Sequence, residues 1–380
     1  MNFRTLTVIL ILGIAFTMNA TLADESILPS VSNLLNAQWK RVKGPASGGS
    51  VLDVGPAGSW YESYVGMPTV NFDGKTYRMW FVGGQETNDP GVPYGAYERI
   101  GLATSSDGLN WQVANGGQPV LDLGPAGSYD NKGLSHPFVL RVGETFMMWY
   151  AAIDGTTAGS LGLSPTHVRV ERVCLATSTD GIQWTRTNGG NPVMDIGPPG
   201  SIDSIQTDGM AIVQSEENFK MVYGAYNGKH SIGAATSPDG INWTKSNGGQ
   251  SVTGLSGSQQ LGPALYFDGT THFMPYGRLL PTNNGGSLWA TYAATSQNMT
   301  SWTPAYNDTS LLSLPGPESN FDSCDGIRGN NHSVHPTKII YQDGRAQMWY
   351  MAQSSVDPTV QRIGLMEAHI KGFPSKCPSH

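Results

Sequence analysis

The stretch Ser105-Ser-Asp-Gly-Leu-Asn-Trp111 returns as Ser178-Thr-Asp-Gly-Ile-Gln-Trp184 and as Ser237-Pro-Asp-Gly-Ile-Asn-Trp243. A weaker fourth copy is Ser296-Gln-Asn-Met-Thr-Ser-Trp302. A phrase repeated at intervals of about 60–70 residues indicates one supersecondary unit used several times. Asp-Gly is typical of a tight hairpin, so each copy is predicted to be a structural turn that leads to a strand starting at Trp. The tryptophans are predicted to pack between neighbouring units.

Each unit also carries a strand rich in Met, Trp and Tyr, followed by a strand that runs into the repeated phrase. The Met-rich strands are predicted at 77–81, 146–150, 219–223, 272–276 and 346–350. Short turns such as Asp73-Gly74 and Asp343-Gly344 lead into them, as expected for hairpins. The pattern therefore predicts repeated units of antiparallel strands.

The last unit lacks a strand that starts at Trp, and the N-terminal segment supplies one. No strand starting at Trp follows Arg362-Ile-Gly-Leu-Met, but the segment 39–52 begins with one, Trp39-Lys-Arg-Val. An N-terminal strand that completes the last sheet leaves no open edge at the seam. We therefore predict an all-β fold over residues 39–371, a five-bladed β-propeller with four antiparallel strands per blade, closed by the N-terminal strand.

The two ends of the chain are predicted to lie outside this fold. Arg4, an apolar run and Thr21-Leu-Ala23 have the order of a secretory signal peptide, predicted at 1–23. An N-terminal segment at 24–38 and a C-terminal tail at 372–380 flank the propeller. The protein is therefore predicted to be secreted or periplasmic.

Composition narrows the partners. The formal net charge is -7 and the sequence has no basic patch, which argues against nucleic acid. No later stretch is long and apolar enough to insert into a membrane. The 10 Trp and 15 Tyr suit carbohydrate-stacking surfaces. Cys174 is predicted to be a buried free thiol, while pairing of Cys324 with Cys377, and the oligomeric state, stay open.

The repeat Gly-Ser-x-Asp, Pro-x-Val, Met-Trp-Tyr and Ala-Thr-Ser-x-Asp-Gly-x-x-Trp resembles the five-bladed propeller glycoside hydrolases, the superfamily of families 43 and 32. The resemblance covers nearly the whole chain after residue 23. It implies carboxylates where innermost strands begin, often before Pro, because glycosidic cleavage needs one protonated and one ionised carboxyl group. The third unit places Asp208 there. The positions before Pro in the other units are Met67, His136, Gly262 and His335.

Further acids precede the inner strands. They are Glu62, Asp130, Asp203 and Asp322. An Asp before Ser commonly caps a turn, so a structural role for the three Asp residues is the alternative to catalysis. Glu62 is less suited to capping.

The connector 322–335 is the richest polar segment of the chain. Asp325, Arg328, His332 and His335 are expected to face the funnel together with His136 and Asp208. Such a group suits sugar hydroxyls, and a structural divalent cation in the funnel is the alternative. No other cofactor is expected.

The sequence favours a secreted, glycan-active protein, most simply a glycoside hydrolase-like enzyme that acts on poly- or oligosaccharide through carboxylates in the funnel. Asp208, Asp130 and Glu62 are its predicted acid/base residues. The predicted substrate-binding residues are His136, His335, Arg328, Asp325, His332 and Tyr64. The alternative is a catalytically silent propeller that binds glycan or a protein partner by the face that carries the long loops, 83–98, 154–171 and 279–287.

Overall fold

The computed structural model describes residues 29–215, 218–281, 287–311, 335–353 and 360–370. These residues form an all-β protein with one short α-helix, α1 (Val31–Leu35). None of the described helices has the length and apolar character needed to cross a membrane. The predicted signal peptide, the tail and most of the connector 322–335 lie outside the described residues.

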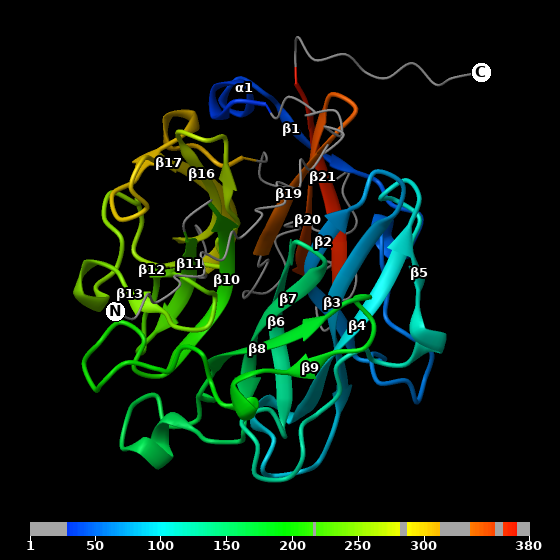
Figure 1. Ribbon diagram of the computed structural model, residues 1–380, viewed down its shortest axis with the longest axis vertical. Coiled ribbons are helices and arrows are strands. Elements are labelled where there is room, and N and C mark those ends of the chain that lie inside the picture. The colour runs from blue at the N-terminus through cyan, green and yellow to red at the C-terminus, as the bar shows by residue number, and fades with distance from the viewer. Residues whose placement is uncertain (1–28, 216–217, 282–286, 312–334, 354–359, 371–380) are drawn as a thin grey trace, which may run out of the picture.

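The strands form antiparallel sets that follow one another round the molecule, from blue at the right of Figure 1 through green to red at the top. The first two sets are β2 (Tyr64–Phe72), β3 (Tyr77–Glu86), β4 (Ala96–Ser105) and β5 (Gln112–Val113), then β6 (Gly133–Val142), β7 (Thr145–Ile153), β8 (Arg172–Ser178) and β9 (Thr185–Arg186). A parallel pair between β4 and β6, with Glu98 opposite Gly133, joins these two sets into one eight-stranded sheet. The next two are β10 (Gln206–Gln214), β11 (Phe219–Tyr226), β12 (His230–Ser237) and β13 (Thr244–Lys245), then β14 (Gln260–Leu261), β15 (Tyr266–Phe267), β16 (His272–Pro281), β17 (Ser287–Ser296) and β18 (Thr303–Pro304). The last is β19 (His335–Gln342), β20 (Arg345–Gln353) and β21 (Gln361–His369), joined by β1 (Trp39–Val42).

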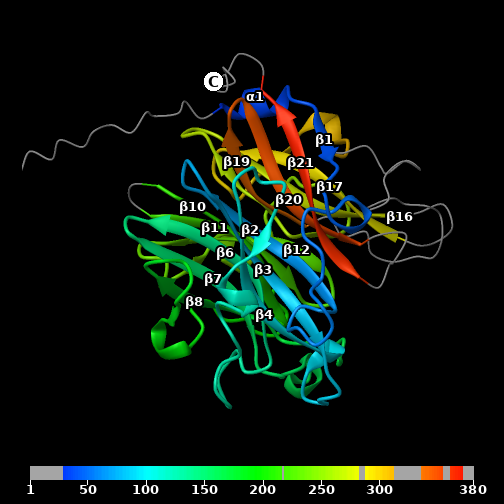
Figure 2. The ribbon, with the colours of Figure 1, turned by 90° about the vertical axis from the view of Figure 1, so that its right-hand side faces the viewer.

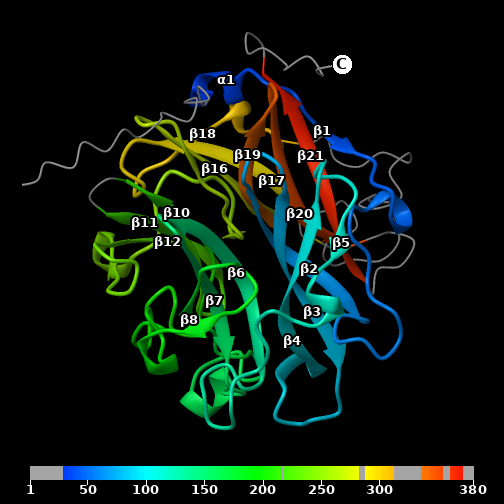
Figure 3. The ribbon, with the colours of Figure 1, turned by 45° about the vertical axis from the view of Figure 1, so that its right-hand side comes forward.

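The N-terminal strand pairs with the C-terminal one, as expected for residues 39–52. β1 runs antiparallel to β21, with Trp39 opposite Ala368, and Figures 2 and 3 show the two side by side. Further along, the Val51 amide donates to the Ile363 carbonyl at 2.8 Å. The two ends of the chain therefore share one sheet.

The repeated hairpins have the structural role predicted for them. Asp107 Oδ1 accepts hydrogen bonds from the amides of Leu109 and Asn110, both at 2.8 Å. Gly108 has a φ of 74°, in the left-handed region that favours glycine. The second and third copies repeat this arrangement around Asp180 and Asp239.

Each hairpin is also bonded to the neighbouring set by a second tryptophan. The Gly108 carbonyl accepts from Nε1 of Trp111 in its own hairpin at 2.9 Å and from Nε1 of Trp349 in the last set at 3.0 Å. Equivalent paired bonds end on Gly181, from Trp184 and Trp80, and on Gly240, from Trp243 and Trp149. The contact from Trp349 joins the last set to the first, so the arrangement closes on itself.

Candidate active site

The innermost strands share a bulge that shapes the centre of the molecule. Register shifts occur after Gly66 in β2, after Ser135 in β6 and after Asp208 in β10. The next residue has a left-handed backbone in each case, with φ of 49° at Met67, 49° at His136 and 48° at Gly209. A bulge re-aims side chains, and strained non-glycine residues cluster at functional sites, so His136 is a marked position.

Three titratable side chains meet at this bulge. One ligand atom each of His136, Glu171 and Asp208 lies within 4.8 Å of those of the other two. His136 comes from β6 and Asp208 from β10, while Glu171 directly precedes β8 and bridges to Gln206 at the start of β10. The site is therefore built where the second and third sets of strands meet.

Glu171 is the buried anchor of this cluster, with 2% of its surface exposed. Its Oε1 accepts from Nε of Arg169 at 2.6 Å, and its Oε2 accepts from Oγ of Ser135 at 3.1 Å. Burial raises the pKa of Glu171, but the Arg169 charge and the His136 hydrogen bond outweigh it and lower the pKa to about 2. Glu171 is thus an ionised, fully bonded carboxylate.

Asp208 is the opposite kind of carboxylate. It keeps part of its surface exposed, and none of the described residues donates a hydrogen bond to it. Burial, helped by the negative charge of Glu171, raises the pKa of Asp208 to about 6 against the pull of His136. Its Oδ1 lies where a Cβ on Gly224 would be 2.3 Å away, so a glycine across the strand makes room for it. Asp208 is the group of this cluster best able to give a proton to a bound molecule.

His136 links the two carboxylates. Its Nδ1 lies 3.1 Å from Oγ of Ser135 and 3.7 Å from Oε2 of Glu171. Burial lowers the pKa of His136, but the Glu171 hydrogen bond and the charges of Asp208 and Glu171 outweigh it, so the net shift is upward. When it is protonated, His136 stabilises an ionised Asp208 beside it.

Arg169 extends the cluster to a second acid. Its guanidinium lies 3.0 Å from Oε2 of Glu98 as well as bonding Glu171, and all three side chains are buried. Tyr64 donates a hydrogen bond to Glu98 from its hydroxyl group. Tyr64, predicted as a substrate-binding residue, is thereby placed beside the cluster, with its own hydroxyl committed to Glu98.

Glu98 and Glu171, which sequence reasoning missed, occupy one position of the repeat. Each lies seven residues before the Ser of its Ser-x-Asp-Gly phrase, at the start of a third strand. The same position in the third and fourth units is taken by His230 and Trp289. Each Glu also precedes an Arg whose structural role is plain, since Arg99 bonds Asp122 at 2.8 Å and Arg172 bonds Asp195 at 2.9 Å. An acid repeated on the loop-bearing face, beside a structural Arg, is the signal that could have found them.

Asp130, one of the predicted acid/base residues, lies in a different network. Its carboxylate is 2% exposed and accepts from Nε of Arg186 at 2.6 Å and from the Tyr150 hydroxyl at 2.9 Å. Asp203 repeats this arrangement, with Lys245 at 2.5 Å and the Tyr223 hydroxyl at 3.2 Å. These acids tie the connector to the middle and outer strands of their own set through side-chain bonds. Their role is structural, but it differs from the turn capping expected of them.

Glu62 also stands apart from the cluster. Its Oε2 accepts from the amide of Gly58 at 2.5 Å, so it caps the turn before β2. The cation and phenol that hold Asp130 are replaced in this set by Val113 and Phe81. Neither Glu62 nor Asp130 therefore enters the chemistry proposed below.

The fifth connector contributes little that can be placed. Asp325, Arg328, His332 and Asp322 lie outside the described residues, as do Cys324 and Cys377. His335 opens β19, but the bulge of that strand comes after Pro336, so Thr337 and not His335 takes the position of His136. The sequence-based alignment of His335-Pro336 with His136-Pro137 is therefore wrong by two residues. Asp208 is also one residue off the expected position, since Gly209 is the counterpart of His136.

The His136, Glu171 and Asp208 cluster has the donor types of a divalent cation site, the alternative weighed for the funnel. Both Glu171 oxygens are already bonded, one of them to the Arg169 guanidinium. A cation would therefore have to displace these bonds and sit against an existing positive charge. The arrangement suits proton transfer better than metal binding.

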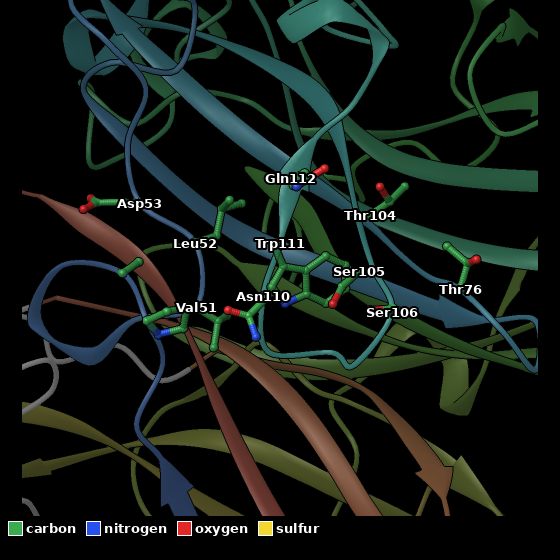
Figure 4. Close-up of a pocket in the computed structure, with 12 residues that line it drawn as sticks. Val51, Leu52, Asp53, Thr76, Thr104, Ser105, Ser106, Asn110, Trp111 and Gln112 are labelled. Carbon is green, nitrogen blue, oxygen red and sulfur yellow. The ribbon is translucent and has the colours of Figure 1, made fainter. Parts of the chain in front are cut away.

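A groove of about 680 Å³ lies elsewhere, between the segment 51–53 and the hairpin 105–112 (Figure 4). Trp111, Asn110 and Thr104 are among its lining residues. Its acid, Asp53, is bonded to Arg362 at 2.7 Å. The groove therefore holds no free acid for chemistry and is separate from the cluster.

Sequence comparison finds a relative that matches part of the chain. No family model matches the chain. It is 31% identical over 134 residues to "Uncharacterized protein Rv1502" of Mycobacterium tuberculosis (strain ATCC 25618 / H37Rv), a match over 34% of this chain and 36% of that protein. The chain thus aligns with about a third of the length of this curated relative.

Cys174, as predicted, is buried and free.

Solved structures match over most of the chain. One, described as a complex of BT0996 with RGII, has a TM-score of 0.66 at 17% identity and covers 92% of this chain and 98% of its own. One from a study of β-1,2-mannosidic linkages in Candida mannan and the GH130 family has a TM-score of 0.63 at 17% identity, covering 90% and 96%. The β-1,2-mannobiose phosphorylase from Listeria innocua has a TM-score of 0.58 at 13% identity. The match covers 85% of this chain and 95% of the phosphorylase. The protein therefore has the propeller-like fold of glycosidases, while membership of family 43 or 32 stays a prediction.

Proposed function

We propose that this protein is a secreted, glycan-active enzyme on a five-bladed propeller, and that Asp208 is its general acid. The observation that carries the proposal is the pairing of two unlike carboxyl groups. Glu171 is ionised and bonded, whereas Asp208 is partly exposed, receives no hydrogen bond from the described residues and has a pKa raised to about 6. Proton donation to a glycosidic oxygen requires a carboxyl group that stays protonated near neutral pH, and a neighbouring ionised carboxylate favours that state of Asp208. Secretion rests on the signal-peptide pattern at 1–23.

In the proposed reaction, protonated Asp208 donates its proton to the glycosidic oxygen as the bond from that oxygen to the anomeric carbon breaks. An oxygen of water or of phosphate then bonds to the anomeric carbon, which gives hydrolysis or phosphorolysis. In hydrolysis the proton that the water loses is released to solvent, and in both reactions Asp208 takes up a proton again from solvent. Glu171 acts through its charge: it fixes Arg169 and His136, and it keeps the Asp208 proton available near pH 6. His136 then stabilises the Asp208 carboxylate that remains.

The β-1,2-mannosides and the RGII named for the structural neighbours set the first substrates to try. The purified protein is incubated with β-1,2-mannobiose and with RGII oligosaccharides, each with and without inorganic phosphate, and released sugar is measured. Sugar release by the wild type but not by Asp208→Asn supports the proposal. Binding without release by both proteins would instead identify a silent, glycan-binding propeller.

A further inference from the structure

Tyr94 is an exposed aromatic residue in a strained position. It lies in the 3-10 turn Pro93–Gly95, in the loop from β3 to β4, with a φ of 69° and 61% of its surface exposed. A bulky residue in the left-handed region is strained and persists only where the surroundings impose that conformation. The loop therefore holds a large aromatic ring in solvent against both its backbone preference and its hydrophobicity.

The loop is built to hold this ring in place. Asp89 accepts hydrogen bonds from the Tyr97 hydroxyl at 2.6 Å, from Nζ of Lys132 at 2.8 Å and from the Gly91 amide at 2.8 Å. The Thr87 amide closes the loop on the Gly95 carbonyl at 2.8 Å. A platform that is ordered before binding loses less entropy when a ligand arrives.

Tyr94 lies against Arg169, at the edge of the candidate active site. The Arg169 guanidinium lies 5.1 Å from the centre of the Tyr94 ring, and the same Arg169 bonds Glu171. The phenol of Tyr94 also interacts electrostatically with the Glu171 carboxylate and with the Tyr226 phenol. The platform and the proposed acid Asp208 are therefore joined through one buried ion pair.

Further rings continue this surface. Tyr226 packs on His230 with ring centres 4.6 Å apart, and His230 packs on Trp289 at 5.6 Å. His230 and Trp289 occupy the repeat position that Glu98 and Glu171 fill in the first two units. The third-strand position is thus acidic on one side of the centre and aromatic on the other.

Charge indicates which sugars fit. Arg169, the cation under Tyr94, is matched by Glu98 and Glu171, so it offers no free positive charge to a ligand. Burial lowers the pKa of His230 to about 4, which leaves its ring uncharged at neutral pH. The charge of a protonated His136 is likewise matched by Glu171 and Asp208. An anionic sugar would therefore meet no unmatched positive charge among these residues, whereas the apolar face of a neutral sugar would stack on the rings.

We infer that Tyr94, with Tyr226 and His230, forms the subsite that stacks a neutral sugar ring next to Asp208. The inference rests on the proposed function, but binding tests it without turnover. Isothermal titration of Asp208→Asn with β-1,2-mannobiose and with digalacturonate gives the two affinities. We expect the neutral disaccharide to bind and the acidic one to bind at least 10-fold more weakly.

Tyr94→Ala in the Asp208→Asn background should weaken β-1,2-mannobiose binding by about 3- to 10-fold, the range expected for one aromatic contact. Tyr94→Phe keeps the ring and should bind as the parent does. Leu161→Ala removes a second exposed apolar side chain of the described residues, at 43% exposure, and serves as the matched control. No binding of the neutral sugar, equal binding by Tyr94→Ala, or preference for digalacturonate would overturn the inference. Binding with the expected differences among these variants, but no turnover by the wild type, would overturn only the proposed function.

Discussion

Asp208 and Glu171 place carboxylate oxygens within 4.8 Å of each other, yet their pKa values move in opposite directions, to about 6 and about 2. The cause is a difference in partners. Arg169, Ser135 and His136 surround Glu171, whereas the described residues give Asp208 no hydrogen-bond donor. The nearby negative charge of Glu171 then adds to the effect of burial on Asp208. The fixed negative charge of Glu171 thus helps to keep the neighbouring Asp208 protonated.

Glu171→Gln should make the melting temperature of the protein less dependent on pH in the acid range. A carboxyl group whose pKa falls from 4.5 to about 2 on folding stabilises the protein above pH 4.5, and this contribution is lost as pH falls through 2. Thermal melting between pH 7 and pH 2.5 should therefore show a smaller acid-induced fall for Glu171→Gln, from a lower starting Tm at pH 7. Glu144→Gln, at an exposed glutamate, is the control and should follow the wild type. Parallel curves for Glu171→Gln and the wild type would refute the ionised role of Glu171.

Asp208→Asn should have the opposite effect on stability. A carboxyl group whose pKa rises from 3.8 to about 6 contributes stability below pH 3.8 that is lost as pH rises through 6. The asparagine removes this loss, so its Tm at pH 8 should equal or exceed that of the wild type. A marked fall in Tm at pH 8 would show instead that the Asp208 carboxylate is bonded and structural.

Asp130→Asn tests the assignment of that acid to the framework. Breaking its buried pair with Arg186 should cost about 3 kcal/mol of unfolding free energy, measured by urea denaturation, because an uncompensated guanidinium is left. Glu62→Gln, which weakens only a turn cap, should cost less than about 1 kcal/mol. A stable Asp130→Asn variant without activity would return Asp130 to the catalytic set.

How far the sequence predicts the structure is clear from these residues. The repeated hairpins and the pairing of β1 with β21 follow from local rules, since Asp-Gly turns and a missing outer strand are visible in the letters. The role of Asp130 was ambiguous because its partner Arg186 is far away in sequence. The cations two residues after Trp184 and Trp243 nevertheless accompany the acids Asp130 and Asp203, and their loss in the first unit accompanies Glu62.

The candidate site was harder to predict, for a geometric reason. Pro137 lies inside the bulge of β6, whereas Pro336 precedes the bulge of β19, so alignment on Pro does not align the two bulges. Asp208 directly precedes the bulge of β10, one position before the counterpart of His136. Asp208 and His136 still meet, because neighbouring inner strands carry them to the same centre. Glu171 directly precedes β8 and reaches that centre through its bridge to Gln206 of the next set, a relationship that no single repeat reveals.

Trp349→Phe tests whether the strand sets form a closed ring. It removes the indole donor to the Gly108 carbonyl, the contact between the last set and the first, and should cost at least about 1 kcal/mol of unfolding free energy. Trp149→Phe removes the equivalent bond to Gly240 inside the ring and is the matched comparison. If both variants lose the same unfolding free energy in urea, the last and first sets pack as neighbouring sets do elsewhere in the ring. A negligible loss for Trp349→Phe alone would indicate that the ring is open between these two sets.

The most direct test of the central claim is the pH dependence of kcat/KM for wild type and Asp208→Asn on the neutral glycan that proves active. A general acid must be protonated, so wild-type kcat/KM should fall as pH rises through about 6. Asp208→Asn should lose about 10²-fold or more at pH 5 and show no such fall. An Asp208→Asn variant with the wild-type rate and the same pH profile would contradict the account.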